Sequence, residues 1–176
     1  MRHFRSWWPW LAFFVMVLSL LWLLSIQGEA SPMPPELTAL ADRIDAQGDA
    51  APQWKRDLLP AIRARKLTRF TANTTCYAFG RPEIDPPCGG NYAAWGMKLR
   101  WGHCAVDRRV IPLGSILYVQ GIDQLLIAVD VGGAIRGHDV DIACETPERY
   151  FSLSKRFSHT NTPAWILGTV SKEQAR

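Results

Sequence analysis

The segment 128–142, which reads AVDVGGAIRGHDVDI, limits the possible folds more than any other part of the chain. It begins as an apolar run, is interrupted at Gly132 and Gly133, and resumes as an alternating run. This pattern predicts a strand, a glycine loop and a second strand, which as a hairpin would bring Asp130 and Asp141 together. Glycine beside acidic residues indicates close approach of the backbone to a ligand. A solvated hairpin with aspartates at its turn is the alternative interpretation.

A third aspartate, Asp107, lies upstream in the run VDRRVIPLG. The order VDRRVIPLG, then AVDVGGAIRG, then DVDI resembles the three-aspartate (3D) domain of bacterial cell-wall enzymes, found in membrane-bound lytic transglycosylase A and in small stationary-phase relatives. The resemblance covers about residues 70–170 and is strongest over 104–144. It implies a mainly β fold, a six-stranded double-psi β-barrel with short helices. Its motif aspartates correspond to Asp107, Asp130 and Asp141, whereas Asp139 lies outside the motif.

The resemblance also implies an activity, that of a lytic transglycosylase. Such an enzyme cleaves the MurNAc–GlcNAc bond of peptidoglycan glycan strands and leaves a 1,6-anhydro product. Asp141 would be the acid and then the base, Asp130 would orient and tune it, and Asp107 would support the loop. An ordinary aspartic acid, with a pKa of ~3.9, is mostly ionised at neutral pH. A nearby carboxylate or partial burial would raise the pKa of Asp141 enough for it to donate a proton.

Substrate contacts are expected from the glycine loop and from aromatic side chains upstream of the first aspartate. We expect Gly132 and Gly133 to approach the glycan. One or two of the upstream aromatic side chains, Trp95 and Trp101 before Tyr92 and Tyr77, are expected to line a glycan groove, although packing in the core is the default for any one aromatic residue. Asn73 stands where the family often has a tyrosine, which leaves the contacts of that strand open. No cofactor and no metal is expected.

Four cysteines, at positions 76, 88, 104 and 144, predict two disulfides in an exported domain. Cys104 precedes Asp107 by three residues and Cys144 follows Asp141 by three, so antiparallel neighbours that join the aspartates would also join these cysteines. This favours Cys104–Cys144 and leaves Cys76–Cys88, although four cysteines allow three arrangements. Zinc is disfavoured because no pair has the tight spacing of a structural site.

The N-terminus predicts a membrane segment. Residues 7–26 carry no charge and at ~1.5 Å per residue span ~30 Å, the thickness of a bilayer core. The basic residues before it would stay inside, so we expect a single-pass inner-membrane anchor with the remainder in the periplasm. Small residues up to Ala30 leave a cleaved signal peptide, and a secreted protein, as the alternative. N-terminal sequencing separates the two, because cleavage would leave Ser31 as the first residue.

The chain is expected to divide into an anchor or signal segment (1–30), a stalk with short helices (31–68) and the barrel domain (69–176). Apolar spacing favours helices at 37–44 and 54–66, the second interrupted by Pro60. We assign these helices to a stalk or to packing on the barrel. Beyond residue 30 the chain has 18 basic and 15 acidic residues, a net charge of +3, and a nucleic-acid binder would normally show a sharper basic stripe.

Two functions remain as alternatives to the enzyme. One is a non-catalytic glycan-binding barrel, and the other is a structural subunit of an envelope machine with a protein partner. The three motif aspartates favour the enzyme, since a binding module has less need of a carboxylate cluster. Fold resemblance alone does not decide between them.

Overall fold

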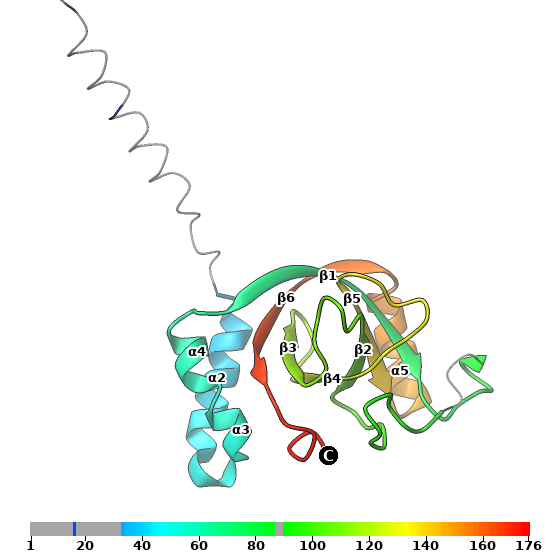
Figure 1. Cartoon of the computed structure of the whole chain (residues 1–176), viewed down its shortest axis with the longest axis horizontal. Helices are drawn as coiled ribbons and strands as arrows, with labels where there is room; N and C mark the ends of the chain where they lie inside the picture. Colours follow the sequence, from blue (N-terminus) through cyan, green and yellow to red (C-terminus); the bar gives the residue numbers. More distant parts are fainter. Residues whose placement is uncertain (1–15, 17–32, 87–89) are drawn as a thin grey trace, which may run out of the picture. The chain divides into compact units, whose positions relative to one another are not determined.

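The computed structural model describes residue 16 and residues 33–86 and 90–176 of the chain. Residues 34–176 form one compact unit, in which six strands close into a barrel in the order β1-β5-β2-β4-β3-β6. The strands are β1 (Thr68–Ala78), β2 (His103–Val106), β3 (Ser115–Val119), β4 (Leu126–Asp130), β5 (Asp139–Cys144) and β6 (Thr160–Thr169). Figure 1 shows the barrel with α2, α3 and α4 grouped on one side and α5 on another. The expected mainly β, six-stranded barrel with short helices is confirmed, and its double-psi connections stay a prediction.

The barrel core is built from strands that are buried along their whole length. Every residue of β2 and β3, and all but the last of β4, is buried, as expected for apolar runs in a closed sheet. β1 and β5 are parallel, as are β2 and β4, and the other four pairs are antiparallel. Parallel pairs carry the carboxyl ends of both strands to the same edge of the barrel.

The segment before the barrel is helical and packs on it. It contains α2 (Pro35–Gln47), the 3₁₀ turn η1 (Gly48–Ala50), α3 (Gln53–Arg56) and α4 (Leu59–Arg63). The buried residues of α2 are Leu37, Ala41 and Ile44, whose spacing places them on one face. Leu58 lies so close to β6 that a Cβ at Gly168 would meet its Cδ2 at 2.9 Å. The expected boundaries of the stalk and barrel domain stay predictions.

The last helix, α5 (Pro147–Arg156), begins at an N-cap that its sequence specifies. The Thr146 hydroxyl accepts a hydrogen bond of 3.3 Å from the Arg149 N–H, and Pro147 occupies the first turn. Glu148 lies in the first turn and two basic residues lie in the last, which suits the helix dipole. The helix packs on β1 and β5 and so supports the strands that carry the site.

The register of β2 corrects the expected hairpin. β4 and β5 do not pair, because β2 lies between them. Ala105 of β2 is the register partner of Asp130 on one side and of Asp141 on the other. Two strand spacings of ~4.8 Å therefore separate the two aspartates, and the small Ala105 side chain lies between them.

The predicted Cys104–Cys144 disulfide is not formed, because Cys104, Cys144 and Cys76 are all free thiols. The prediction assumed that Asp107 pairs with Asp141, but the register pairs Ala105 with Asp141, so Cys104 faces Ile142 instead of Cys144. The Cys144 thiol donates to the Ile142 carbonyl and the Cys76 thiol to the Tyr150 carbonyl, each at 3.7 Å. Cys88 lies outside the described residues, but its expected partner Cys76 is a free thiol, so the structure does not contain the predicted Cys76–Cys88 disulfide either.

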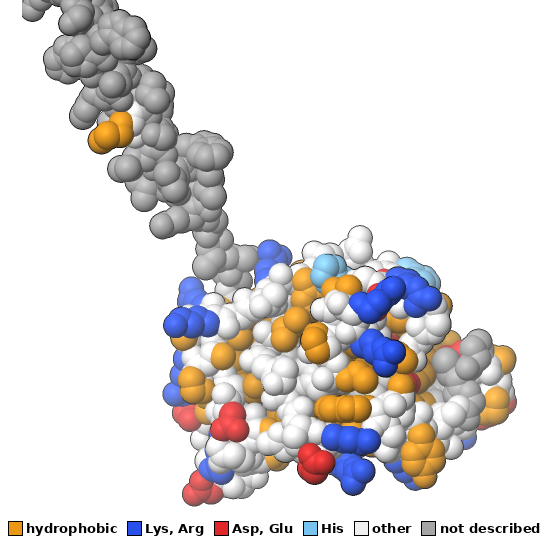
Figure 2. Space-filling view, in the orientation of Figure 1, with side chains coloured by type: hydrophobic (Ala, Val, Ile, Leu, Met, Phe, Trp, Pro, Cys, Tyr) orange, Lys and Arg blue, Asp and Glu red, His pale blue; other side chains and the backbone are white. Residues whose placement is uncertain are grey.

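Two further expectations concern the N-terminus and the charge. The predicted membrane segment 7–26 lies outside the described residues, apart from Met16. Over the described ranges, no helix is long and apolar enough to cross a bilayer. Figure 2 shows Lys and Arg side chains in several separate groups on the face that it draws.

Candidate active site

A pocket of about 310 Å³ lies where β4 ends and β1, β2 and β5 run alongside it. Its aspartates are Asp130, the last residue of β4, and Asp141 in β5. The other lining residues are Tyr77, Gly90, Tyr92, Leu99, Ala105, Val131, Gly132, Gly133 and Ile135. Two motif aspartates and both predicted glycines therefore lie in one pocket, with Ala105 between the carboxylates.

Asp141 is the titratable group at the centre of this pocket. Its half-buried side chain accepts a hydrogen bond of 2.7 Å from the Thr75 hydroxyl, whose residue is its register partner in β1. Burial raises the pKa of Asp141 to about 6, and Asp85 and Asp130 add to the rise by repulsion. The Thr75 hydrogen bond and His159 act in the opposite direction on this pKa. Asp141 therefore exchanges a proton within the range where general acids and bases operate.

Asp130 differs from Asp141 because hydrogen-bond donors fix its carboxylate. One oxygen accepts the Ala94 N–H at 2.8 Å and the Val131 N–H at 2.9 Å, and the other accepts the Tyr77 hydroxyl at 3.1 Å. Burial and the neighbouring Asp130 raise the pKa of Tyr77, so the phenol keeps its proton and remains a donor. Asp130 is thus held as an acceptor in a fixed orientation beside Asp141.

Asp107, the third motif aspartate, does not line the pocket. Its buried carboxylate forms a bidentate ion pair with Arg109, with N–O distances of 2.9 and 2.7 Å. It also accepts the backbone N–H of Gly137 at 3.0 Å, in the loop between β4 and β5. The Arg109 hydrogen bonds, followed by the Gly137 N–H, hold the pKa of Asp107 well below its usual range. Asp107 therefore stays ionised and is tied to the loop between β4 and β5, and its expected supporting role stays a prediction.

The two expected tryptophans do not line the aspartate pocket, and their contact with a glycan stays a prediction. Trp101 packs against the core under the Arg149 guanidinium, 4.1 Å from its ring centroid, and lines a different pocket. Trp95 packs against Gly114, where a Cβ would meet its Cη2 at 2.9 Å. The exposed aromatic ring in the aspartate pocket is that of Tyr92, which is 72% exposed. An isolated antiparallel β-bridge between the backbones of Tyr92 and Lys98 holds Tyr92 at the pocket wall.

Asp139 and Asn73 form a separate contact beside the site. The Asn73 amide donates to Asp139 at 2.9 Å, and the other oxygen of Asp139 accepts the Arg136 N–H at 2.8 Å. Asp139 shares the strand face of Asp141, but it closes the turn before β5 and does not line the pocket. The Asn73 position therefore contributes to the turn.

Sequence reasoning did not identify the residues that set the environment of Asp141. Thr75, which hydrogen-bonds to Asp141, lies in β1 and could be recognised only once β1 was known to neighbour β5. Ala105 carries no chemical signal in the sequence at all. Within the described part of the chain, no cluster of three or more His, Cys, Asp or Glu side chains could hold a metal ion.

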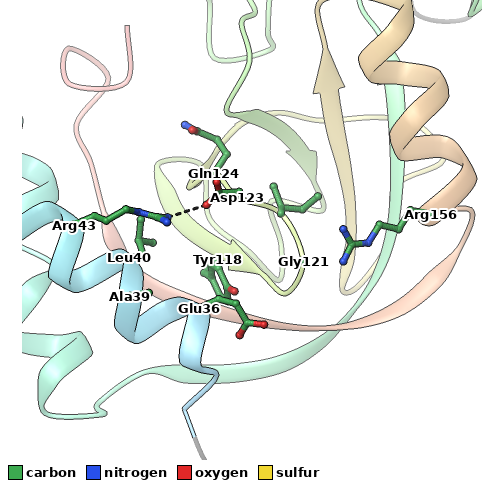
Figure 3. Close-up of a pocket in the computed structure, with 10 residues that line it drawn as sticks. Glu36, Ala39, Leu40, Arg43, Tyr118, Gly121, Asp123, Gln124 and Arg156 are labelled. Carbon is green, nitrogen blue, oxygen red and sulfur yellow. Dashed lines mark hydrogen bonds and ion pairs between the residues drawn. The ribbon is translucent and has the colours of Figure 1, made fainter.

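A second pocket, of about 410 Å³, lies between α2 and the turn that follows β3 (Figure 3). Arg43 reaches across it to Asp123, with an N–O distance of 2.8 Å, while Glu36 and Arg156 enter from other sides. Its basic and acidic side chains are therefore balanced within the pocket. It contains none of the motif aspartates.

Comparison with known proteins agrees with the motif. Residues 103–154 match the family profile of the 3D domain, a segment that contains Asp107, Asp130 and Asp141. This segment of the chain is thus similar to the 3D domain. The resemblance inferred from the three motifs is thereby confirmed, and the 3D domain supplies β2–β5 and most of α5.

Individual proteins resemble the chain over shorter parts. The cell wall-binding protein YocH of Bacillus subtilis is 53% identical over 38 residues, which cover 22% of this chain and 13% of YocH. The lytic transglycosylase MltA of Escherichia coli is 27% identical, with a TM-score of 0.38, over 46% of this chain and 28% of MltA. For the lytic transglycosylase LtgG of Burkholderia pseudomallei the identity is 24% and the TM-score 0.35, over 45% of this chain and 27% of LtgG. The chain thus spans less than a third of each of these proteins.

Proposed function

We propose that this 3D-domain protein cleaves the glycan strands of the bacterial cell wall as a lytic transglycosylase. The observation that carries the proposal is Asp141, a half-buried carboxyl with a pKa raised to about 6, in one pocket with Asp130. Cleaving a glycosidic bond needs a proton for the leaving oxygen, and a carboxyl with this pKa holds one for part of the time near neutral pH. The 3D-domain match and the cell wall-binding name of YocH support the choice of polymer.

The chemistry proceeds in two proton transfers. In the first, the Asp141 carboxyl gives its proton to the glycosidic oxygen, the bond from that oxygen to the anomeric carbon breaks, and positive charge develops on the sugar. In the second, the Asp141 carboxylate removes the proton of the sugar's 6-hydroxyl, whose oxygen bonds to the anomeric carbon. The 1,6-anhydro ring closes, no water is consumed, and Asp141 regains its proton.

Other residues of the pocket assist this cycle. Asp130 lies beside Asp141 and supplies negative charge near the developing cation, while its three donors prevent it from turning away. The Gly133 backbone is open, with no atom within 4 Å of a would-be Cβ, so a sugar can approach the loop closely. The exposed Tyr92 ring offers a face on which a sugar can stack.

A second candidate is a wall-binding module without catalysis. Its support is the 53% identity to a protein named for cell-wall binding. In that case the pocket would hold a glycan, and the raised pKa of Asp141 would have no part in a reaction. The two candidates differ in whether a covalent bond of the glycan breaks.

The test is incubation of the full chain with purified cell-wall sacculi, followed by mass spectrometry of the soluble products. The proposal expects anhydro-muropeptides from the natural chain. Asp141→Asn should release them about 10²–10⁴-fold more slowly, because an amide cannot donate or accept the proton. Sacculus binding without anhydro products would favour the wall-binding module, and full activity in Asp141→Asn would overturn the assigned mechanism.

Asp139→Asn is the matched control. It makes the same substitution on the same face of β5, two residues away and outside the pocket. Its effect on the rate should be far smaller than that of Asp141→Asn, and circular dichroism of both variants would verify that they fold. If both variants lost the same fraction of the cleavage rate, the cause would be disruption of β5 and not the removal of the acid.

A further inference from the structure

A third pocket lies at the other end of the strands that reach the aspartates. β2 and β4 are parallel, and both run from residues that line this pocket, His103 and Ile127, to residues that line the aspartate pocket, Ala105 and Asp130. The third pocket measures about 410 Å³, within the range of small-molecule sites, and no residue lines both pockets. It is therefore a separate feature of the barrel.

The charged side chains that line this pocket are all positive. Lys55, Arg100 and Arg176 contribute cations, and no Asp or Glu is among its lining residues. Within the described ranges, none of these three side chains forms an ion pair. Arg100 donates instead to the Ala175 carbonyl at 3.1 Å and to the His103 ring at 3.2 Å, which fixes its position without neutralising it. An anion entering the pocket would find unpaired cations.

The same pocket contains aromatic and amide side chains, which a simple anion would not require. Trp54 and Trp101 line it, and the Lys55 ammonium lies 5.4 Å from the centroid of the Trp54 ring. Gln124 and Gln174 add amides that can donate to and accept from hydroxyl groups. Tryptophan rings combined with such amides suit the apolar C–H faces and the hydroxyls of a sugar.

His103 is a buried polar residue among those that line this pocket. Its side chain is fully buried, and its Nδ1 has no hydrogen-bond partner within the described part of the chain. Burial lowers the pKa of His103, so the ring is neutral at physiological pH. An unpaired buried nitrogen costs free energy unless a ligand or water satisfies it.

We propose that this pocket binds a sugar that carries an anionic group, a carboxylate or a phosphate. The cations recognise the anionic group, and the Trp54 ring and the two amides recognise the sugar. The site is independent of the aspartate pocket, and so the proposal stands whether or not the chain cleaves glycans.

Isothermal titration calorimetry with the full chain tests the site. The probes are N-acetylmuramic acid, N-acetylglucosamine 6-phosphate, neutral N-acetylglucosamine and inorganic phosphate. At least one anionic sugar should bind about tenfold or more tightly than both the neutral sugar and phosphate, and added salt should weaken its binding. The tighter of the two anionic sugars identifies the carboxylate or the phosphate as the preferred group. Equal binding of neutral and anionic sugars, or no binding of either anionic sugar, would overturn the proposal.

Variants place the binding in this pocket. Lys55→Gln and Trp54→Ala should each weaken binding of the anionic sugar about five- to tenfold, through loss of a charge and of a stacking surface. Lys66→Gln is the matched control, since Lys66 is exposed and does not line the pocket, and its binding should equal that of the natural chain. Asp141→Asn should also bind normally. Unchanged binding of the anionic sugar in Lys55→Gln would contradict its assignment to this pocket. If Trp54→Ala fails to fold, the result for Lys55→Gln alone decides the test.

Discussion

Asp141 and Asp107 belong to the same motif, yet the barrel gives them opposite electrostatic environments. Asp141 is half-buried, receives one side-chain hydrogen bond and has a pKa raised to about 6. Asp107 is buried against Arg109 and the Gly137 N–H, and its pKa is lowered. The first carboxyl can exchange a proton near neutral pH, whereas the second is a fixed anion. Within one motif, the hydrogen-bond donors around each carboxylate therefore decide which aspartate can exchange a proton near neutral pH and which stays ionised.

The largest expected effect of this difference between Asp141 and Asp107 is on the pH dependence of glycan cleavage. A general acid with a pKa of about 6 is mostly protonated at pH 5 and only about one part in a hundred protonated at pH 8. Product release should therefore fall by up to about a hundredfold between these pH values, with its midpoint near 6. A cleavage rate that stays constant from pH 5 to pH 8 would show that Asp141 does not donate the proton.

A second test compares the thermal stability of the Asp141→Asn and Asp107→Asn variants with that of the natural chain. The two substitutions should change this stability in opposite directions. An aspartate has a pKa of ~3.9 in the unfolded chain, and the fold raises that of Asp141 to about 6. The ionised Asp141 carboxylate therefore lowers the free energy of unfolding above pH 6, whereas below about pH 4 the carboxyl is protonated in both states and has no such effect. Asp141→Asn should therefore stabilise the fold by about 1–3 kcal/mol at pH 8 and by little at pH 4.

For Asp107 the sign is reversed. Its lowered pKa stabilises the fold above about pH 4, and this contribution is lost as the pH falls below its unfolded pKa. Asp107→Asn should thus destabilise the protein at pH 8, because Arg109 and the Gly137 N–H lose a carboxylate. Calorimetric melts of both variants at pH 8 and pH 4 provide the measurement. A shift of the same sign in both variants at pH 8 would contradict the comparison.

The smallest expected effect is that of Thr75 on the pKa of Asp141. Its hydroxyl stabilises the charged form of Asp141 and so lowers the pKa of that carboxyl. Thr75→Val keeps the shape and removes the donor, so the midpoint of the pH–rate profile should rise by about half to one unit. The matched control is Thr71→Val on the same strand, at a position outside the pocket. An unchanged midpoint in Thr75→Val would show that this hydrogen bond does not tune the acid.

Much of the site could be predicted from the sequence because its signals are local. The apolar runs and the glycine turn predicted β4 and β5, and the order of the three motifs predicted the 3D domain and its six-stranded barrel. The helical spacing of residues 37–44 predicted a buried face on what is now α2. The cap of α5, Thr146 followed by Pro147, is also a local signal, although α5 was not predicted.

The tertiary structure decided everything that depends on which strands are neighbours. The insertion of β2 between β4 and β5 placed Ala105 between the two aspartates and moved Cys104 out of reach of Cys144. The parallel pairing of β1 with β5 brought Thr75 to Asp141. Trp101 lines a different pocket from the one that Tyr92 lines. Strand order and register arise from packing between segments far apart in the chain. A pattern of residues along one segment records which side chains face the core, but it does not record which other strand lies beside them.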